Sequence, residues 1–372
     1  MKEPIAVAHI FLSLKIGGME KVGIDLVKNM DQRKYKHYVL CLDELGTFGE
    51  ELKKEGFSVF AFHKGHGFKF SLLIKLIRFF KKHNIRVVHT NNPAPHFWGG
   101  IAAWIAGVKI RIHTKHGRNF ITIKRKVLIN RLSALFSKKV VSVSADSAQL
   151  THEIERVPQD KIMTIYNGVD TDLFMKKPLN ETLKRELGIP AETRIIGSIS
   201  RFSPDKDYET LILAFKEVAS VEQDVVLLLV GDGETKERMV KLAQQIKIAD
   251  KTIFSGFRSD ILDLLNLIDI FVLSTHTEGI SISLLEAMAT ERPVIATDVG
   301  GNGEIVEHGD NGYLVPENDV EGLKNAILTL LNNSDERMRL ATAARKRVVE
   351  KFSLQNTVAG YEALYKEFLD KE

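Results

Sequence analysis

Two glutamates, Glu278 and Glu286, lie eight positions apart and flank residues that could bind an anion. Glu278 is followed by the turn Gly279, Ile280 and Ser281, and Glu286 falls in an apolar segment that favours a short helix packed into an α/β core. The turn leaves free backbone N–H groups at the start of this helix, and such an end carries about half a positive charge. Two carboxylates spaced in this way could hold hydroxyl groups around a bound phosphate. The pattern therefore indicates a site for a nucleotide sugar.

A pair of cations, Arg201 and Lys206, lies in a loop that directly follows a predicted strand at Ile195–Ile199. Basic side chains at the carboxyl end of a parallel strand are well placed to bind a diphosphate. Their charge would offset the negative charge that builds up on a leaving diphosphate, which is electrostatic catalysis. The alternative is a pair of ordinary solvated cations, and the position after a strand argues against it.

In the first half of the chain, Gly17 and Gly18 form a predicted turn between the first strand and the first helix. Glycine allows backbone N–H groups to approach a phosphate or sugar, although tight packing of strand against helix would also explain the pair. His116 follows another predicted strand and precedes a glycine. A neutral imidazole there can hydrogen-bond a sugar hydroxyl, and a protonated one can assist a leaving group. His113 is the alternative, but it falls within the strand, where a packing role is more common.

Together with the residues around them, these motifs resemble glycosyltransferase family 4, whose members are retaining enzymes of the GT-B fold. The family signature consists of a glutamate, seven residues, a second glutamate, a strand and a Gly-Gly turn. This sequence matches it with Glu278, Glu286, Pro293–Thr297 and Gly300–Gly301. A surface helix with two solvated glutamates is the alternative, but the flanking residues are apolar. The resemblance covers nearly the whole chain.

The resemblance implies a role for each candidate residue. By analogy with the family, Glu286 accepts hydrogen bonds from the ribose hydroxyls, Glu278 contacts the transferred sugar, and residues 279–281 offer backbone N–H groups. His116 would face the sugar and phosphate, and the turn at Gly17–Gly18 matches a turn of the family. The implied catalytic residues are His116, Glu278, Arg201 and Lys206.

The sequence departs from the family pattern at the edge of the predicted site. Ser200 stands where a glycine usually precedes the arginine, and Gly303 stands where a proline usually precedes Glu304. These departures bear on donor specificity rather than on the fold. No metal or other cofactor is expected, because turn chemistry explains the sequence Asp170-Thr-Asp172 better than metal binding, and no Cys/His cluster suggests zinc.

The implied activity is that of a metal-independent, retaining hexosyltransferase. It would move a hexose or N-acetylhexosamine from a nucleotide sugar to a hydroxyl of a lipid-linked or polysaccharide acceptor in cell-surface glycan synthesis, and UDP is the commonest nucleotide in the family. No residue stands out as a covalent nucleophile, so the implied mechanism is front-face displacement, in which the leaving phosphate helps to deprotonate the acceptor. Two alternatives keep the fold: a nucleotide-sugar epimerase or phosphorylase, and a catalytically inactive, membrane-associated glycan-assembly subunit.

The composition is typical of a globular protein with two domains: 372 residues, of which 44% are hydrophobic and 27% charged. The single cysteine, Cys41, excludes an intramolecular disulfide framework and fits a reducing compartment. The N-terminal apolar run is short and is followed by Lys15, unlike a signal peptide, and no stretch approaches the roughly 20 apolar residues that span a bilayer. We therefore expect a cytoplasmic protein.

Strand-like and helix-like segments alternate along the chain, which predicts parallel sheets flanked by helices. The strands are predicted at Ile5–Ile10, His37–Cys41, Val87–Thr90, Ile110–Thr114, Val140–Ser144, Ile162–Ile165, Ile195–Ile199, Val225–Val230, Ile253–Ser255, Ile270–Leu273, Pro293–Thr297 and Tyr313–Val315. Two such series predict the α/β, GT-B architecture of two Rossmann-like domains facing across a cleft. The expected parts are an acceptor- and membrane-docking domain at 1–168, a linker at 169–190, a nucleotide-sugar-binding domain at 191–353, and a helix at 354–372 that crosses back to the first domain.

Charge is distributed unevenly between the two halves. Residues 1–180 contain 30 Lys and Arg residues and 15 Asp and Glu residues, whereas the remainder contains 22 and 33. No acidic residue occurs between Glu55 and Asp146, and basic residues alternate with apolar ones in the tracts Phe68–Lys82 and Ile123–Arg131. Such tracts fit either a core-facing helix with a solvated basic face or a helix that lies on an anionic membrane. The missing acids favour the inner face of the cell membrane, and no recognition motif supports nucleic acid.

Overall fold

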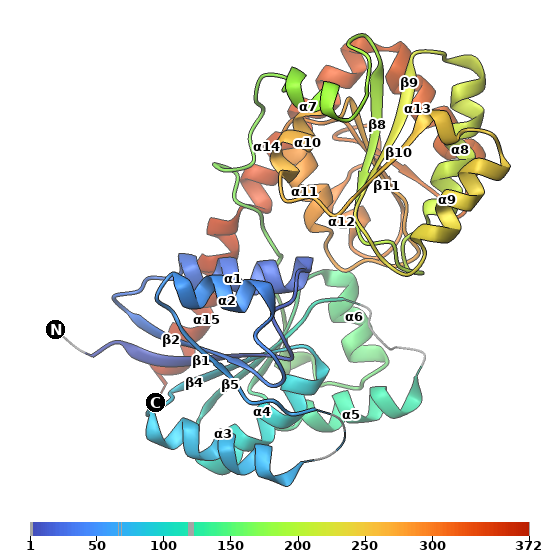
Figure 1. The fold of residues 1–372 in the computed structure, drawn as a ribbon. Helices are drawn as coiled ribbons and strands as arrows, with labels where there is room; N and C mark the ends of the chain where they lie inside the picture. The colour runs from blue at the N-terminus through green and yellow to red at the C-terminus, as the bar shows by residue number, and fades with distance from the viewer. Residues whose placement is uncertain (1–2, 66, 68, 118–122, 372) are drawn as a thin grey trace. The chain divides into compact units, whose positions relative to one another are not determined.

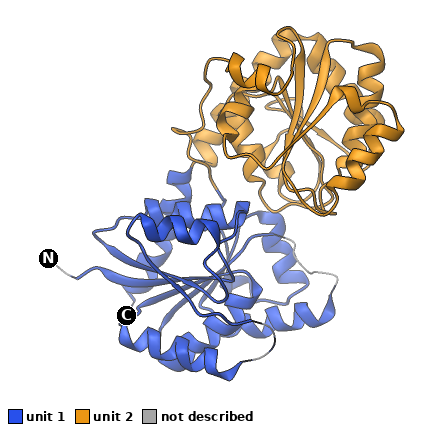
Figure 2. Ribbon diagram, viewed as in Figure 1, with its two compact units in different colours: residues 1–167, 354–372 blue, residues 168–353 orange. Residues whose placement is uncertain are grey.

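The computed structural model describes residues 3–65, 67, 69–117 and 123–371. These residues form two compact units, one made of residues 1–167 and 354–372 and the other of residues 168–353 (Figure 2). The boundary lies between Asn167 and Gly168, next to the end expected for the first domain at residue 168. The chain passes from one unit to the other twice, at residues 167–168 and 353–354. Val169 forms a parallel bridge with Ser353, so these two connections lie next to each other.

Unit 1 contains a seven-stranded parallel sheet with the strand order β3-β2-β1-β4-β5-β6-β7 (Figure 1). The five strands between its two edges are almost wholly buried, as expected for parallel strands covered on both faces. The strands of the sheet are β1 (Ile5–Phe11), β2 (Tyr35–Cys41), β3 (Ser58–Ala61), β4 (Val87–Asn91), β5 (Ile110–Lys115), β6 (Lys139–Ser142) and β7 (Ile162–Thr164).

Helices cover both faces of this sheet. They are α1 (Gly18–Asn29), α2 (Gly46–Lys54), α3 (Phe70–Lys82), α4 (Pro93–Ala106), α5 (Lys124–Ala134), α6 (Ala145–Glu153) and α15 (Leu354–Leu369). One core contains apolar residues of α3 and α4 against alternate residues of β1, β2 and β4. The other face packs against α1, α2 and α15.

The last helix, α15, belongs to unit 1 although unit 2 precedes it in the chain. Its Tyr361 and Tyr365 are fully buried. The Tyr365 hydroxyl lies 2.6 Å from His89 Nδ1, and the Tyr361 hydroxyl lies 2.8 Å from Thr114 Oγ1. Apolar packing and these hydrogen bonds therefore hold α15 on the sheet.

Unit 2 contains a six-stranded parallel sheet with the strand order β10-β9-β8-β11-β12-β13. Its strands are β8 (Arg194–Ile199), β9 (Val225–Val230), β10 (Thr252–Gly256), β11 (Ile270–Leu273), β12 (Val294–Thr297) and β13 (Tyr313–Val315). Its helices are α7 (Glu181–Glu186), α8 (Tyr208–Val221), α9 (Lys236–Gln245), α10 (Ile261–Leu267), α11 (Ile282–Ala289), α12 (Asn302–Ile305), α13 (Val320–Asn332) and α14 (Ser334–Lys351).

The twelve predicted strands are all present, with ends that differ by at most two residues. One strand was not predicted from the sequence, the four-residue edge strand β3, which pairs with β2. The segment expected to be a linker, 169–190, lies within unit 2 and contains the short helix α7, whose first turn is capped by the Asn180 side chain. Among the described helices, none is long and apolar enough to cross a membrane.

Candidate active site

In each unit the strand order reverses at one point, between β1 and β4 in unit 1 and between β8 and β11 in unit 2. Open parallel sheets bind ligands outside the carboxyl ends of the strands at such a reversal. In unit 2 the loop after β8 contains Arg201 and Lys206, and the loop after β11 contains Glu278. The predicted residues therefore lie where this topology places a ligand site.

Lys206 and Glu278 are 72 positions apart in the chain, yet their side chains form an ion pair. Both side chains are largely buried, at 11% and 17% exposure. Arg201 is exposed, and it makes no ion pair within the part of the chain that the structure describes. The two loops thus present a cation next to a carboxylate, with a further cation close by in the sequence.

The turn after Glu278 leads directly into α11. The Ser281 hydroxyl caps this helix by accepting a hydrogen bond from the Leu284 N–H at 3.3 Å. Gly279 and Ile280 are buried, and Glu286 is partly buried in the second turn of the helix. All the donor-binding residues predicted for unit 2 therefore occur in the two loops at the strand reversal and in α11.

Glycines with no room for a side chain support both loops. A Cβ on Gly301 would lie 1.7 Å from the Gly279 carbonyl oxygen, and one on Gly300 would lie 2.0 Å from that of Glu278. The turn after β9 supports the other loop, because a Cβ on Gly231, whose φ is 139°, would lie 2.0 Å from the Ser200 carbonyl oxygen. The Gly-Gly turn of the signature therefore serves to let β12 approach the backbone next to Glu278.

In unit 1, Gly17 is the N-cap of α1 and Gly18 its first residue, so the pair joins β1 to α1 as predicted. Gly17 has a φ of −176°, an extended conformation open to any residue. A Cβ there would lie 2.4 Å from the Glu20 carboxylate, which occupies the space beside the glycine. The turn lies at the strand reversal of unit 1, at the carboxyl end of β1.

His116 directly follows β5, and its Nε2 lies 3.0 Å from Asn91 Oδ1 at the end of β4. Because this oxygen can only accept, Nε2 carries the proton and Nδ1 keeps a free lone pair. Burial lowers the pKa of His116 to about 4, so the imidazole is neutral at pH 7. Of the two roles expected for this histidine, the neutral hydrogen-bonding role fits the structure.

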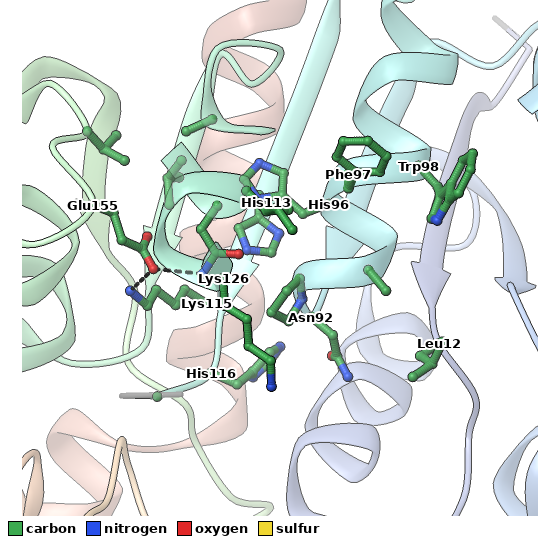
Figure 3. A pocket seen from close by; sticks show the side chains of 18 of the residues that line it. Leu12, Asn92, His96, Phe97, Trp98, His113, Lys115, His116, Lys126 and Glu155 are labelled. Carbon is green, nitrogen blue, oxygen red and sulfur yellow. Dashed lines mark hydrogen bonds and ion pairs between the residues drawn. The ribbon is translucent and has the colours of Figure 1, made fainter. Parts of the chain in front are cut away.

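His113 is buried inside β5, as expected for a packing histidine. Its ring stacks on that of His96 with centroids 3.6 Å apart, and its Nδ1 lies 3.1 Å from the Thr90 carbonyl oxygen. Burial, with smaller contributions from the neighbouring histidines and Lys115, lowers its pKa well below 6.5. Because the His113 ring is fully packed inside the protein, His116 remains the candidate of the two (Figure 3).

Family models match both units. The model for group 1 glycosyl transferases matches residues 180–347, and the model for Glycosyltransferase Family 4 matches residues 16–173. The chain belongs to glycosyltransferase family 4.

Similar proteins extend over nearly the whole of this family 4 glycosyltransferase. N-acetyl-alpha-D-glucosaminyl L-malate synthase of Bacillus anthracis is 29% identical over 370 residues, 95% of each chain. UDP-Gal:alpha-D-GlcNAc-diphosphoundecaprenol alpha-1,3-galactosyltransferase of Escherichia coli is 25% identical over 375 residues, 97% of this chain and 96% of the relative. The crystal structure of Anabaena Alr3699/HepE with UDP and glucose matches with a TM-score of 0.87 at 23% identity, over 97% of this chain and 99% of that one. This likeness shows the two-domain GT-B fold.

Some features of the glycosyltransferase site were missed in the sequence analysis. The Thr275 hydroxyl donates a hydrogen bond to the Asp205 carbonyl oxygen at 2.7 Å, and this bond links the loop after β11 to the loop after β8. Asn91 holds His116, as described above. Threonine and asparagine are common at the ends of strands. The sequence therefore does not show that Thr275 bonds to Asp205 or that Asn91 bonds to His116.

The motif Asp170-Thr-Asp172 forms a turn. Asp170 Oδ1 accepts hydrogen bonds from the backbone N–H groups of Asp172 at 3.0 Å and Leu173 at 2.9 Å. Within the described ranges, no cluster of three or more His, Cys, Asp or Glu residues could hold a metal ion. The turn accounts for this motif without a metal.

Proposed function

We propose that this glycosyltransferase transfers a hexose or N-acetylhexosamine from a UDP-sugar to a hydroxyl of a lipid-linked or polysaccharide acceptor, with retention at the anomeric carbon and without a metal. The observation that carries the proposal is the ion pair between Lys206 and Glu278 at the strand reversal of unit 2. One side chain suits a phosphate and the other a sugar hydroxyl, so together they suit the junction between diphosphate and sugar.

Each predicted residue has a part in binding the donor. Arg201 and Lys206 bind the diphosphate and offset the charge that it gains on leaving. Glu278 and the backbone N–H groups of residues 279–281 bind the sugar, and Glu286 accepts hydrogen bonds from the ribose. In unit 1, the turn at Gly17–Gly18 and the neutral imidazole of His116 are proposed to contact the phosphate and the sugar.

The reaction proceeds on one face of the sugar. The bond between the anomeric carbon and the diphosphate oxygen breaks as the acceptor oxygen forms its bond to the same carbon. The acceptor proton passes to an oxygen of the leaving diphosphate, so no protein base is required. Cations are therefore the groups that this step needs most, because the leaving diphosphate gains negative charge before it gains the proton.

The name of one relative and the HepE structure support a UDP-sugar donor, whereas the names of the two relatives differ in the acceptor. The Escherichia coli relative is named for UDP-Gal and a diphosphoundecaprenol acceptor, whereas the Bacillus anthracis relative is named for L-malate. The HepE structure contains UDP and glucose. A feature of this chain itself, the exposed surface of α5, favours the lipid-linked acceptor.

Helix α5 combines exposed leucines with exposed cations. Leu128 and Leu132 are 53% and 46% exposed, and Leu135 just after the helix is 65% exposed. Lys124, Arg125 and Arg131 of the same helix are exposed too. Basic helices with large exposed apolar side chains suit an anionic lipid surface. We therefore place unit 1 on the inner face of the cell membrane through α5.

The donor is tested by the rise in melting temperature that nucleotide sugars produce, because a ligand that binds only the folded protein stabilises it. A UDP-sugar at 100 times its Kd should stabilise the protein by about 2.7 kcal/mol. Glu286→Ala should lose this shift through the missing ribose contact, and its own melting temperature without ligand is the baseline from which its shift is measured.

Two further results complete this test. NMR of the product should show the anomeric configuration of the donor, and EDTA should leave turnover unchanged. A stabilising shift that Glu286→Ala retains would overturn the donor assignment. Product of inverted configuration would overturn the proposed mechanism.

A further inference from the structure

The loop that contains Arg201 and Lys206 is closed at its base by Tyr208. The loop leaves β8 at Ser200, and α8 begins at Tyr208. The Tyr208 hydroxyl donates a hydrogen bond to the Ser200 carbonyl oxygen at 2.9 Å, and it lies 2.8 Å from Ser200 Oγ. One side chain therefore joins the end of this loop to its beginning.

The hydroxyls of Ser200 and Tyr208, here called the hydroxyl pair, bond in a fixed direction. A tyrosine hydroxyl has a single proton, and that of Tyr208 goes to the Ser200 carbonyl oxygen. Ser200 Oγ must therefore donate the bond between the two hydroxyls. Burial raises the pKa of Tyr208 to about 12, so its hydroxyl keeps this proton at pH 7.

The Tyr208 ring is itself held in place by the core of unit 2. It is 2% exposed, and it stacks on Phe202 with ring centroids 4.1 Å apart. The Phe202 backbone N–H donates to the Asp232 carbonyl oxygen at 2.9 Å, and the Phe202 carbonyl oxygen accepts from the Thr235 N–H at 3.0 Å. The hydroxyl pair therefore connects the loop after β8 to a part of the structure that is already fixed.

A fixed loop matters because of the cations that it presents. Arg201 directly follows Ser200, and Lys206 lies two residues before Tyr208. Ordering a flexible loop when a ligand binds costs conformational entropy, whereas groups that are already in position avoid this cost. The alternative is that the hydroxyl pair only stabilises the core of unit 2, in which case it would affect unfolding but not the choice of ligand.

We propose that Tyr208 and Ser200 are positioning residues, whose hydrogen bonds hold the loop after β8 so that Arg201 and Lys206 are placed for a diphosphate before it binds. The part of the proposal that concerns the diphosphate rests on the function proposed above, and the order of the loop does not. Glycine, which usually stands at the position of Ser200 in the family, has no hydroxyl. The bond donated by Ser200 Oγ is therefore a feature of this chain rather than of the family pattern.

Hydrogen exchange measured by mass spectrometry tests the order of the loop in the protein without ligand. Tyr208→Phe removes the hydroxyl and keeps the ring, so the amides of residues 201–206 should exchange about tenfold faster. Tyr313→Phe is the matched control, because it removes a hydroxyl of the same unit that donates to Glu336 at 3.0 Å, on the edge strand β13. It should leave the exchange of the loop unchanged.

Titration calorimetry with UDP and with uridine tests the effect on the diphosphate. Uridine has the base and the ribose of UDP but neither phosphate, so its affinity does not depend on Arg201 and Lys206. Tyr208→Phe should lower the affinity for UDP about tenfold and leave that for uridine near the wild-type value. A loss of core stability alone would lower the melting temperature without changing the ratio of the two affinities.

Ser200→Ala is a second, milder variant, because it keeps the bond from the Tyr208 hydroxyl to the carbonyl oxygen of residue 200. It should lower the affinity for UDP about threefold. In the double variant Ser200→Ala/Tyr208→Phe, the affinity should fall no further than in Tyr208→Phe, because the Ser200 hydroxyl has already lost its partner there.

The two measurements separate this proposal from the donor assignment. Faster exchange of the loop in Tyr208→Phe, in a protein whose wild type does not bind UDP, would support the positioning role and contradict the proposed donor. The proposal is overturned if neither variant changes the exchange of the loop, if both variants bind UDP like a wild type that binds it, or if the affinities for UDP and uridine fall together.

Discussion

Lys206 and Glu278 form a largely buried ion pair at the strand reversal of unit 2. If Lys206 binds the leaving diphosphate, Lys206→Ala should lower kcat/KM by about 10² to 10³, the usual effect of removing one group that stabilises developing negative charge. Most of the loss should appear in kcat, because that charge develops only in the transition state. Steady-state kinetics with the donor found in the melting screen measures both constants.

Two variants control this experiment. Lys206→Arg keeps a cation beside Glu278 and should retain more activity than Lys206→Ala. Arg238→Ala removes an exposed cation of the same unit that pairs with Glu209, and it should leave turnover unchanged. Normal turnover in Lys206→Ala would show that the diphosphate is held elsewhere.

Because Gly301 packs against the Gly279 carbonyl oxygen, we expect a methyl group added at Gly301 to lower both stability and donor affinity. A Cβ at this position would lie 1.7 Å from that oxygen, so Gly301→Ala must displace the backbone next to Glu278. Overpacking of this kind costs about 1 to 3 kcal/mol, which corresponds to a fall in melting temperature of roughly 2 to 12 °C for a unit of this size. We expect the variant to melt earlier and to bind the donor weakly.

Gly303→Ala is the matched control for this substitution. It lies two residues further on, in α12, and its added Cβ would meet the Asp298 carboxylate at 3.1 Å, the end of a side chain that can shift. Its melting temperature and donor affinity should stay near those of the wild type. Equal behaviour of the two variants would mean that the loop tolerates the displacement.

At the scale of single residues, the sequence revealed the residues that belong to recognisable local motifs and missed those that only the fold brings together. Glu278 and Glu286 lie in one loop and one helix, so their spacing alone places them together. Lys115 and Glu155 are 40 positions apart, and each one is an ordinary charged residue in its own segment. They form an ion pair because β5 pairs with β6, which leads into α6 and Glu155.

At the scale of elements, period and composition predicted twelve strands, the short edge strands β7 and β13 among them, but not β3. Central parallel strands are apolar on both faces and therefore stand out, whereas β3 is a short edge strand with an exposed Phe60. The destination of α15 was known only from the resemblance. In physical terms it depends on contacts with three separate strands, because Tyr365 contacts His89 of β4 and Tyr35 of β2, and Tyr361 contacts Thr114 of β5.

Buried histidines in β1, β2 and β4 make the stability of unit 1 sensitive to acid. Burial lowers the pKa of His37 to about 4 and that of His89 to about 3, and it lowers the pKa of His9 well below 6.5. Below pH 6.5 the unfolded chain binds protons that the folded unit excludes, so stability is complete above pH 6.5 and falls towards pH 4. Each of these histidines should lower the free energy of unfolding by about 1.4 kcal/mol when the pH falls from 7.5 to 5.5.

Urea unfolding at several pH values measures this dependence. In His37→Phe one titrating group is missing, so the loss of stability between pH 7.5 and 5.5 should shrink by about 1.4 kcal/mol relative to the wild type. The comparison is between two slopes, so a general change in stability of the variant does not affect it. A free energy of unfolding that is constant over this range would contradict the buried, neutral state of these histidines.

At the scale of the whole molecule, the basic first half divides into two kinds of helix. Helix α3 buries Leu72, Leu76 and Phe80 in the core and leaves mainly its cations exposed, although Phe70 and Ile74 are exposed near its start. Helix α5 buries few residues and exposes leucines. Next to it, the ring of Trp104 at the end of α4 lies 5.6 Å from the ring of Phe136, which follows α5. The tracts Phe68–Lys82 and Ile123–Arg131 have similar compositions, and composition does not show which face of a helix packs against the rest of the protein.

This difference predicts which helix anchors the protein. Leu128→Ser/Leu132→Ser should weaken binding to vesicles of phosphatidylglycerol and phosphatidylcholine at least tenfold, because burying each leucine in a membrane contributes on the order of 1.5 kcal/mol or more. The matched control, Met338→Ser/Val349→Ser, removes two exposed apolar side chains of α14 in unit 2 and should bind like the wild type. Cosedimentation at low and high salt measures both contributions, since salt weakens the attraction of the basic residues but not the insertion of the leucines. Equal binding by the two double variants would remove α5 as the anchor, and no binding by the wild type at low salt would remove the membrane from the proposed function.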